Sequence, residues 1–233
     1  MPDHDGSTPG SGPWHVAVIP DGNRRWATQH GLAAVEGYHA GLRTGLDVVT
    51  WCLEAGVAHL SAFGSSQENL EHRSLDQVVA IHAAVRALCV EAAAIPGVAV
   101  HVFGAPERLP AAVPDRAELV RLARLPPRSG RLVLHVGVGY SARDDLTALA
   151  TAGERLGGER VAREPHRFLC SAGVPAADLV IRTGARPRLS GFLPLQSACA
   201  ELYFLHTLWP ALSRAEFSDV LARFAVRDRR PGE

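Results

Sequence analysis

The sequence contains no lysine, and all 24 of its basic residues are arginines. This absence excludes Schiff-base chemistry and a P-loop, because both depend on a lysine amine. The basic groups that remain are guanidiniums, whose forked donors suit oxyanions such as phosphate. A GC-rich coding bias is the simplest origin of the pattern, but the chemical consequence is the same.

Cysteines are few and dispersed, and no two of them form a CxxC pair: Cys52, Cys89, Cys170 and Cys199. Neither a zinc site nor a disulfide framework is indicated, and a reducing cytoplasm fits best. No stretch approaches the roughly 18 uninterrupted apolar residues of a membrane span, so at most peripheral membrane contact is expected. The first residues, MPDHDGSTPGSGP, lack the apolar core of a signal peptide, and we expect residues 1–13 to form a disordered tail.

An excess of charge of either sign is also missing, because 24 acidic residues balance the 24 basic ones. Neither nucleic acid nor an anionic membrane is therefore expected as the main partner. The length of 233 residues, with 47% hydrophobic and 21% charged residues, is ordinary for a globular protein. We predict one domain that spans residues 14–233.

Short apolar runs rich in β-branched residues predict six strands, and most of the intervening segments have helical spacing. The clearest helices are expected at 75–95, which a Pro-Gly pair ends, and at about 37–55. This alternation predicts an α/β fold with one open, mostly parallel six-stranded sheet flanked by helices. The strands are predicted at 15–19, 58–63, 98–103, 131–138, 178–181 and 201–205.

Polar segments follow several of these strands, and open parallel sheets bind ligands beyond the carboxyl ends of their strands. After the first strand, Asp21 offers a carboxylate, while Asn23, Arg24 and Arg25 offer donors at the expected start of a helix. A diphosphate held by Mg²⁺ suits this mixture, because magnesium commonly binds one or two carboxylates together with phosphate oxygens. The alternative is that DGN is a plain turn and that the two arginines are only solvated.

A second basic cluster follows the fifth strand in the segment RTGARPRLS, with Arg182, Arg186, Arg188 and Ser190. It suits a second phosphate group, although a basic surface loop is the alternative. Glu201 begins the next apolar run, where it would be a buried carboxylate beside a metal. A role in capping the end of a secondary-structure element is equally consistent with the local sequence. Two anion sites beside apolar elements together suggest a reaction between two lipid-like diphosphates.

From His15 to Gly232 the chain resembles the cis-prenyltransferase (undecaprenyl diphosphate synthase-like) family. The matching motifs, in order, are HVAVIPDGNRRWA, SSQEN, GYSARDD, DLVIRTGARPRLSGFLPLQSACAELYF, LWP and RDRRPG. The resemblance implies that family's α/β fold, a homodimer, Mg²⁺ as cofactor and two prenyl diphosphate substrates.

The resemblance also assigns roles to individual residues. Asp21 would bind Mg²⁺ and, with Asn23 and Asn69, would form the catalytic set. Glu201 would assist metal placement. Gly22, Asn23, Arg24 and Arg25 would surround the allylic diphosphate, whereas Arg182, Arg188, Ser190 and, across the dimer, Arg230 and Gly232 would hold the second diphosphate.

Several departures from the family's motifs lie around phosphate handling and the substrate pocket. Pro20 precedes the aspartate where methionine is usual, and Tyr38 follows Gly37 where histidine is usual. The combination of PDG, GY and F-x-PL resembles the irregular lavandulyl-type diphosphate synthases. We therefore predict head-to-middle coupling of dimethylallyl diphosphate with geranyl or dimethylallyl diphosphate. The alternatives are regular short-chain elongation with isopentenyl diphosphate and a non-catalytic partner subunit.

Overall fold

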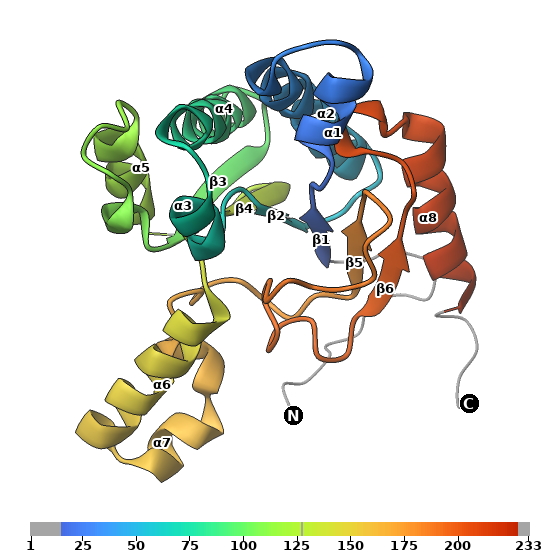
Figure 1. Cartoon of the computed structure of the whole chain (residues 1–233). Helices are drawn as coiled ribbons and strands as arrows, with labels where there is room; N and C mark the ends of the chain where they lie inside the picture. The colour runs from blue at the N-terminus through green and yellow to red at the C-terminus, as the bar shows by residue number, and fades with distance from the viewer. Residues whose placement is uncertain (1–14, 127, 228–233) are drawn as a thin grey trace.

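The computed structural model describes residues 15–126 and 128–227. The expected tail at 1–13 and the expected diphosphate ligands Arg230 and Gly232 lie outside these residues. Six strands form one sheet in the order β3-β4-β2-β1-β5-β6, and every pair of neighbouring strands is parallel (Figure 1). The predicted fold class is confirmed, and each strand begins and ends within a residue of its prediction: β1 (His15–Ile19), β2 (His59–Phe63), β3 (Val98–Gly104), β4 (Leu132–Val138), β5 (Leu179–Arg182) and β6 (Glu201–Phe204).

The helices follow the strands as the alternation predicts, and the two named in advance are α2 and α4. Figure 1 shows α1, α2, α4 and α5 on one side of the sheet, α8 beside β6, and α6 with α7 extending away from it. The α-helices are α1 (Asn23–Gln29), α2 (Ala34–Glu54), α3 (Gln67–His72), α4 (Leu75–Ala93), α5 (Arg116–Ala123), α6 (Ala142–Leu156), α7 (Gly158–Arg163) and α8 (Arg214–Arg227). The 3₁₀ helices are η1 (Pro106–Arg108), η2 (Pro165–Phe168) and η3 (Trp209–Ala211).

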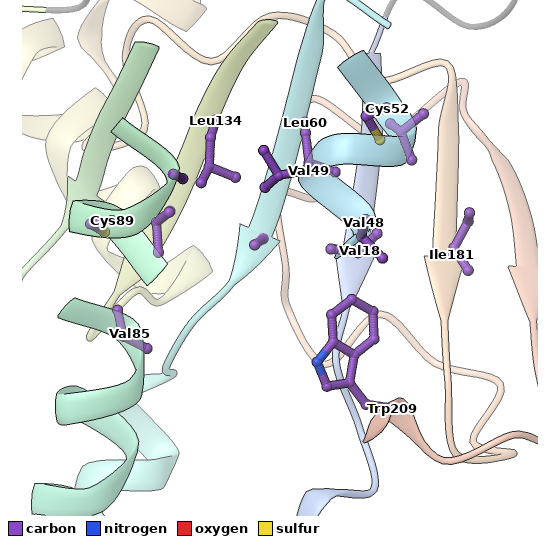
Figure 2. Close-up of a cluster of buried hydrophobic side chains, with 14 of the residues drawn as sticks. Val18, Val48, Val49, Cys52, Leu60, Val85, Cys89, Leu134, Ile181 and Trp209 are labelled. Carbon is purple, nitrogen blue, oxygen red and sulfur yellow. The ribbon is translucent and has the colours of Figure 1, made fainter. Parts of the chain in front are cut away.

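The main core lies between the sheet and the helices α2, α4 and α8. Along β1, the side chains of Val16 and Val18 enter this core, while Ala17 and Ile19 point to the other face, as the two-residue period of a strand requires. Figure 2 shows Val18 of β1 and Val48 of α2 together at the centre of this core. All residues of β1 and β4 are buried, which explains why the two strands read as continuous apolar runs.

Among the described helices, none is long and apolar enough to cross a bilayer. All four cysteines are free thiols, which agrees with their dispersed spacing.

The crossing of α1 and α2 depends on a glycine. A Cβ atom built on Gly37 would lie 2.2 Å from the carbonyl oxygen of Asn23, which is too close for any side chain. We expect Gly37→Ala to lower the free energy of unfolding by about 1–3 kcal/mol, because the two helices would have to separate. Urea unfolding followed by circular dichroism measures this change.

Gly153 of α6 supplies the matched control, because a Cβ atom there would meet nothing within 4 Å. Gly153→Ala is expected to raise the free energy of unfolding by about 0.5–1 kcal/mol, since alanine restricts the unfolded chain and favours a helix. Equal effects of the two substitutions would contradict the packing argument.

A row of histidines from β1, β2, β4 and β3 lies on the face of the sheet opposite the main core. Nδ1 of His59 lies 2.9 Å from Nε2 of His135, and Nδ1 of His101 lies 2.9 Å from Nδ1 of His135. Nε2 of His15 lies 2.8 Å from the Ser61 hydroxyl. Burial lowers the pKa of His15 to about 4 and, with help from the neighbouring histidines, that of His135 to about 2. Near pH 7, His15 and His135 are therefore neutral in the folded protein.

We expect acid to destabilise the fold through this row. The unfolded chain takes up protons near pH 6.5, whereas folded His15 and His135 do so only at much lower pH. Their contribution is therefore fully present above pH 6.5 and declines by roughly 1.4 kcal/mol per pH unit for each group as the pH falls. Urea midpoints between pH 7 and pH 4 measure the slope. His135→Gln should flatten it, and an unchanged slope in that variant would contradict this assignment.

Candidate active site

The order of the strands creates a crevice between β1 and β5. The chain leaves β1 towards β2 on one side, whereas β5 pairs with β1 on the other side. Loops that follow these two strands consequently diverge, and such a switch point is the usual ligand site of an open parallel sheet. Ile19 pairs with Arg182, so Asp21 emerges level with the end of β5.

Asp21 forms ion pairs with one arginine from each of the two basic clusters in the sequence. Its Oδ1 lies 3.2 Å from Nη2 of Arg25, and its Oδ2 lies 2.9 Å from Nη2 of Arg182. The carboxylate remains 27% exposed, while the Arg182 side chain is only 5% exposed. One carboxylate is therefore shared by an arginine from each cluster and still faces the crevice.

The backbone of Asp21 is fixed by two further residues. The Thr183 hydroxyl donates to the carbonyl oxygen of Asp21 at 2.8 Å and accepts from its amide at 3.0 Å. The amide of Trp209 donates to the same carbonyl at 3.0 Å. Such a clamp holds a functional carboxylate in one geometry.

Two glycines make this close approach possible. Gly22 has a φ of 113°, and a Cβ atom there would lie 2.8 Å from Leu208. Gly184 has a φ of 82°, and a Cβ atom there would lie 2.4 Å from Nη2 of Arg25, which instead donates to the Gly184 carbonyl at 2.9 Å. Both positions combine a left-handed backbone with no room for a side chain, so only glycine fits.

Arg182 also shapes the loop that carries the second cluster. Its Nη1 donates to the Ser190 hydroxyl at 2.7 Å and to the carbonyl of Arg188. Ser190 is held in the left-handed region with a φ of 52°. The side chains of Arg188 and Ser190 thus sit on a loop that folds back over a buried guanidinium, with both residues exposed.

A polar pocket of about 400 Å³ occupies this crevice. Six arginines and two carboxylates, Asp21 and Glu68, are among the described residues that line it, so its field strongly favours anions. The structure therefore brings together most of the residues that the sequence predicts for the catalytic set and the two diphosphate sites. They are Asp21, Gly22, Asn23, Arg24, Arg25, Asn69, Arg182, Arg188 and Ser190.

A smaller apolar cavity of about 80 Å³ adjoins the polar pocket in the main core. Its wall includes Val48 and Val49 of α2, Val85 and Leu88 of α4, and Leu134 of β4. The two spaces share five lining residues: Pro20, Asn23, Tyr38, Gly64 and Ile81. An anion site thus opens onto an apolar site, which suits a ligand with a charged head and a hydrocarbon tail.

Asn23 lies where the two spaces meet. Its Nδ2 donates to the Pro20 carbonyl at 3.4 Å, and its Oδ1 is buried without a hydrogen-bond partner among the described residues. A Cβ atom on Gly41 would lie 2.2 Å from that Oδ1, so glycine is needed there to admit the amide.

Glu201 is the predicted site residue that the structure places elsewhere. It pairs with Leu179, at the amino end of β5, whereas Asp21 lies beyond the carboxyl ends of the strands. Glu201 is absent from the described lining of the pocket, and its metal role stays a prediction.

The donor set fits a magnesium ion that a diphosphate brings with it. No group of three or more histidine, cysteine, aspartate or glutamate side chains suited to a metal occurs in the described part of the chain. Asp21 offers an accessible carboxylate between Arg25 and Arg182, and Glu68 lines the same pocket. Mg²⁺ usually binds one or two carboxylates, phosphate oxygens and water.

Sequence reasoning did not identify Arg73 or Thr183 as members of the site, and it noted Tyr38 only as a departure from the motif. Nη1 of Arg73 donates to the Tyr38 hydroxyl at 2.5 Å, and both residues line the pocket. Burial lowers the pKa of the Arg73 guanidinium, and nearby Arg24 acts in the same direction. A detectable signal was present for Thr183, because it directly follows Arg182 at a strand end.

The fold and this pocket define a class: α/β enzymes that bind phosphorylated apolar substrates at a sheet switch point. Comparisons with known proteins make the class specific. The family model described as putative undecaprenyl diphosphate synthase matches residues 19–232. A trans,polycis-polyprenyl diphosphate synthase ((2Z,6E)-farnesyl diphosphate specific) from Thermobifida fusca is 39% identical, covering 94% of this chain and 80% of that protein. An isoprenyl transferase from Aquifex aeolicus is 33% identical, covering 94% and 96%.

Among solved structures, lavandulyl diphosphate synthase from Lavandula x intermedia, in complex with dimethylallyl diphosphate, is similar with a TM-score of 0.79. It is 25% identical, and the match covers 96% of this chain and 99% of that one. The chain belongs to the undecaprenyl diphosphate synthase family of cis-prenyltransferases. The prediction that it is a prenyltransferase is thereby confirmed.

Proposed function

We propose that the chain couples two short prenyl diphosphates head-to-middle and releases diphosphate. Dimethylallyl diphosphate would be the donor, and geranyl or dimethylallyl diphosphate would be the acceptor. One observation carries the proposal: an arginine-rich pocket for two anionic groups opens directly onto an apolar cavity of only about 80 Å³. Such a cavity suits a short hydrocarbon tail.

The contacts of Asp21 support a division of the pocket between two diphosphates. The allylic diphosphate would lie against Gly22, Asn23, Arg24 and Arg25, and Oδ1 of Asp21 faces Arg25. The second diphosphate would lie against Arg182, Arg188 and Ser190, and Oδ2 faces Arg182. Mg²⁺, when bound by Asp21 and diphosphate oxygens, would supply charge that stabilises the departing group.

The chemistry then needs no nucleophile from the protein. The bond between the allylic carbon and oxygen breaks, and the electron pair leaves with the diphosphate. The arginines stabilise that developing charge. The double bond of the second substrate attacks the allylic carbon through its C2 atom, and the resulting cation loses a proton. Asn23 and Asn69, which both line the pocket, would orient the reacting groups.

Head-to-middle coupling is favoured by two features. The segments PDG, GY and F-x-PL resemble those of lavandulyl-type synthases, and the similar solved structure is named as a lavandulyl diphosphate synthase. The second candidate is regular head-to-tail elongation with isopentenyl diphosphate. The names of several relatives, such as the polyprenyl diphosphate synthase of Thermobifida fusca, favour it.

We also propose a homodimer, in which the terminal segment with Arg230 and Gly232 completes the partner's second diphosphate site. The motivating observation is that two of the residues that line the pocket, Arg188 and Ser190, are exposed, so that a segment of a partner could reach them. Size-exclusion chromatography with light scattering tests the dimer, and a monomer at micromolar concentration would contradict it.

Product analysis tests the proposed reaction. The protein is incubated with Mg²⁺ and dimethylallyl diphosphate alone, then with geranyl diphosphate added, then with isopentenyl diphosphate added. Dephosphorylated products are identified by mass. A ten-carbon product from dimethylallyl diphosphate alone is expected. Products only where isopentenyl diphosphate is present would support the regular enzyme, and no coupled product from any mixture would support a non-catalytic subunit.

A further inference from the structure

A tyrosine stands at the junction of the polar pocket and the apolar cavity. We call the five residues shared by these spaces the throat: Pro20, Asn23, Tyr38, Gly64 and Ile81. A ligand whose head lies in the pocket and whose tail lies in the cavity must pass between these residues. Tyr38 has the largest side chain of the five, so its position controls how wide the passage is.

Tyr38 is fixed from both ends. Its residue is only 6% exposed, and its ring belongs to the main core. Its hydroxyl accepts a hydrogen bond from Nη1 of Arg73 at 2.5 Å, and the guanidinium carbon of Arg73 lies 5.9 Å from the centre of the ring. Arg73 follows α3, whereas Tyr38 lies in α2, so the contact links Tyr38 to a second segment that lines the polar pocket.

Two of the α2 residues that line the cavity beyond the tyrosine are glycines, and the others are Leu42, Val48 and Val49. Gly41 and Gly45 lie three and seven residues after Tyr38, on the same face of the helix, and both line the cavity. Leu88 from α4 packs against Gly45, because a Cβ atom there would lie 3.2 Å from its Cδ1. At Gly41 and Gly45 the helix adds no side chain to the cavity, whereas Tyr38 places a ring at the throat.

We propose that Tyr38, held by Arg73, is a specificity-determining residue that restricts the allylic substrate to a short tail. This inference rests on the proposed function, in which the diphosphate lies at Asp21 and the tail enters the cavity. A five-carbon tail passes beside the ring and ends in the cavity without displacing it. Longer tails need the ring to move, and this movement breaks the contact with Arg73.

Binding of unreactive analogues tests the proposal without depending on turnover. Dimethylallyl and farnesyl thiolodiphosphates, in which sulfur replaces the bridging oxygen, are titrated by calorimetry in the presence of Mg²⁺. The readout is the ratio of their affinities. Each methylene that an opened throat newly buries is worth roughly fourfold in affinity. Tyr38→Ala is therefore expected to shift the ratio at least about tenfold towards the farnesyl analogue.

Three further variants separate the effect of the Tyr38 ring from that of its hydrogen bond to Arg73 and from a general loss of an aromatic side chain. Tyr38→Phe retains the ring without its anchor and should shift the ratio by about threefold in the same direction. Tyr38→Leu replaces the alanine variant if that protein does not fold by circular dichroism, with the same expected direction. Phe168→Ala removes an aromatic ring in η2 that lines neither the pocket nor the cavity, and it should leave the ratio within about twofold.

A ratio in Tyr38→Ala within twofold of the wild-type value would overturn the proposal, as would an equal shift in Phe168→Ala. The wild-type protein is assayed for coupled product in parallel. If it made none, the proposed function would fail while the binding ratios still decided the role of Tyr38.

Discussion

Replacing Asp21 by alanine is expected to lower turnover by at least about a thousandfold while the protein stays folded. The carboxylate is the accessible acidic group that both Arg25 and Arg182 contact, so its loss removes the shared ligand between the two proposed diphosphate positions. The backbone of residue 21 would keep its hydrogen bonds to Thr183, which are made by the amide and the carbonyl. Initial rates of diphosphate release with saturating substrates and Mg²⁺ measure the effect.

Asp219→Ala is the matched control for this experiment. Asp219 forms an exposed ion pair with Arg223 on α8, at 2.8 Å, and lies outside the described lining of the pocket. Its replacement should leave turnover within about twofold, since exposed pairs contribute little. Turnover near the wild-type rate in Asp21→Ala would contradict the assigned role.

Replacing Arg182 by leucine is expected to impair the second substrate far more than the allylic one. The buried guanidinium orders the loop through Ser190 and the carbonyl of Arg188, and it also pairs with Asp21. We predict a loss of about a thousandfold in kcat/KM for the acceptor, with a smaller loss in the affinity for a donor analogue. Removing one partner of this largely buried pair should also lower the free energy of unfolding by about 2 kcal/mol, a value reduced for the partial exposure of Asp21.

Arg223→Leu serves as its control, because that arginine is two-thirds exposed. Its free energy of unfolding should change by less than about 0.5 kcal/mol. Equal losses for donor and acceptor in Arg182→Leu would show that the residue does not discriminate between the two diphosphates.

The sheet and the position of the site were predictable from the sequence for simple physical reasons. β1 and β4 are buried on both faces, so their sequences read as unbroken apolar runs. Because parallel strands end at the same edge of the sheet, residues at the ends of separate strands are expected to meet. In the structure, Oδ2 of Asp21 lies 2.9 Å from Nη2 of Arg182. The periodic spacing in the segments of α2 and α4 likewise defined both helices to within a few residues.

Contacts between distant segments were not predictable in the same way. The hydrogen bond between Tyr38 and Arg73 depends on how α2 and the residue after α3 come together, which no local pattern specifies. The direction in which α6 and α7 extend from the sheet could not be predicted from the sequence either, since it depends on tertiary packing (Figure 1). Glu201 is instructive in another way. It begins its apolar run, so its position at the amino end of β6 was already implied by the sequence.

The connectivity of the product tests the central claim most directly. The enzyme is given a mixture of dimethylallyl diphosphate molecules that carry a single ¹³C label, either at C1 or at C2. Head-to-middle coupling joins C1 of one molecule to C2 of another, so one-bond coupling between two ¹³C nuclei should appear in the NMR spectrum of the dephosphorylated product. A product without that coupling, or product formed only after isopentenyl diphosphate is added, would contradict the claim.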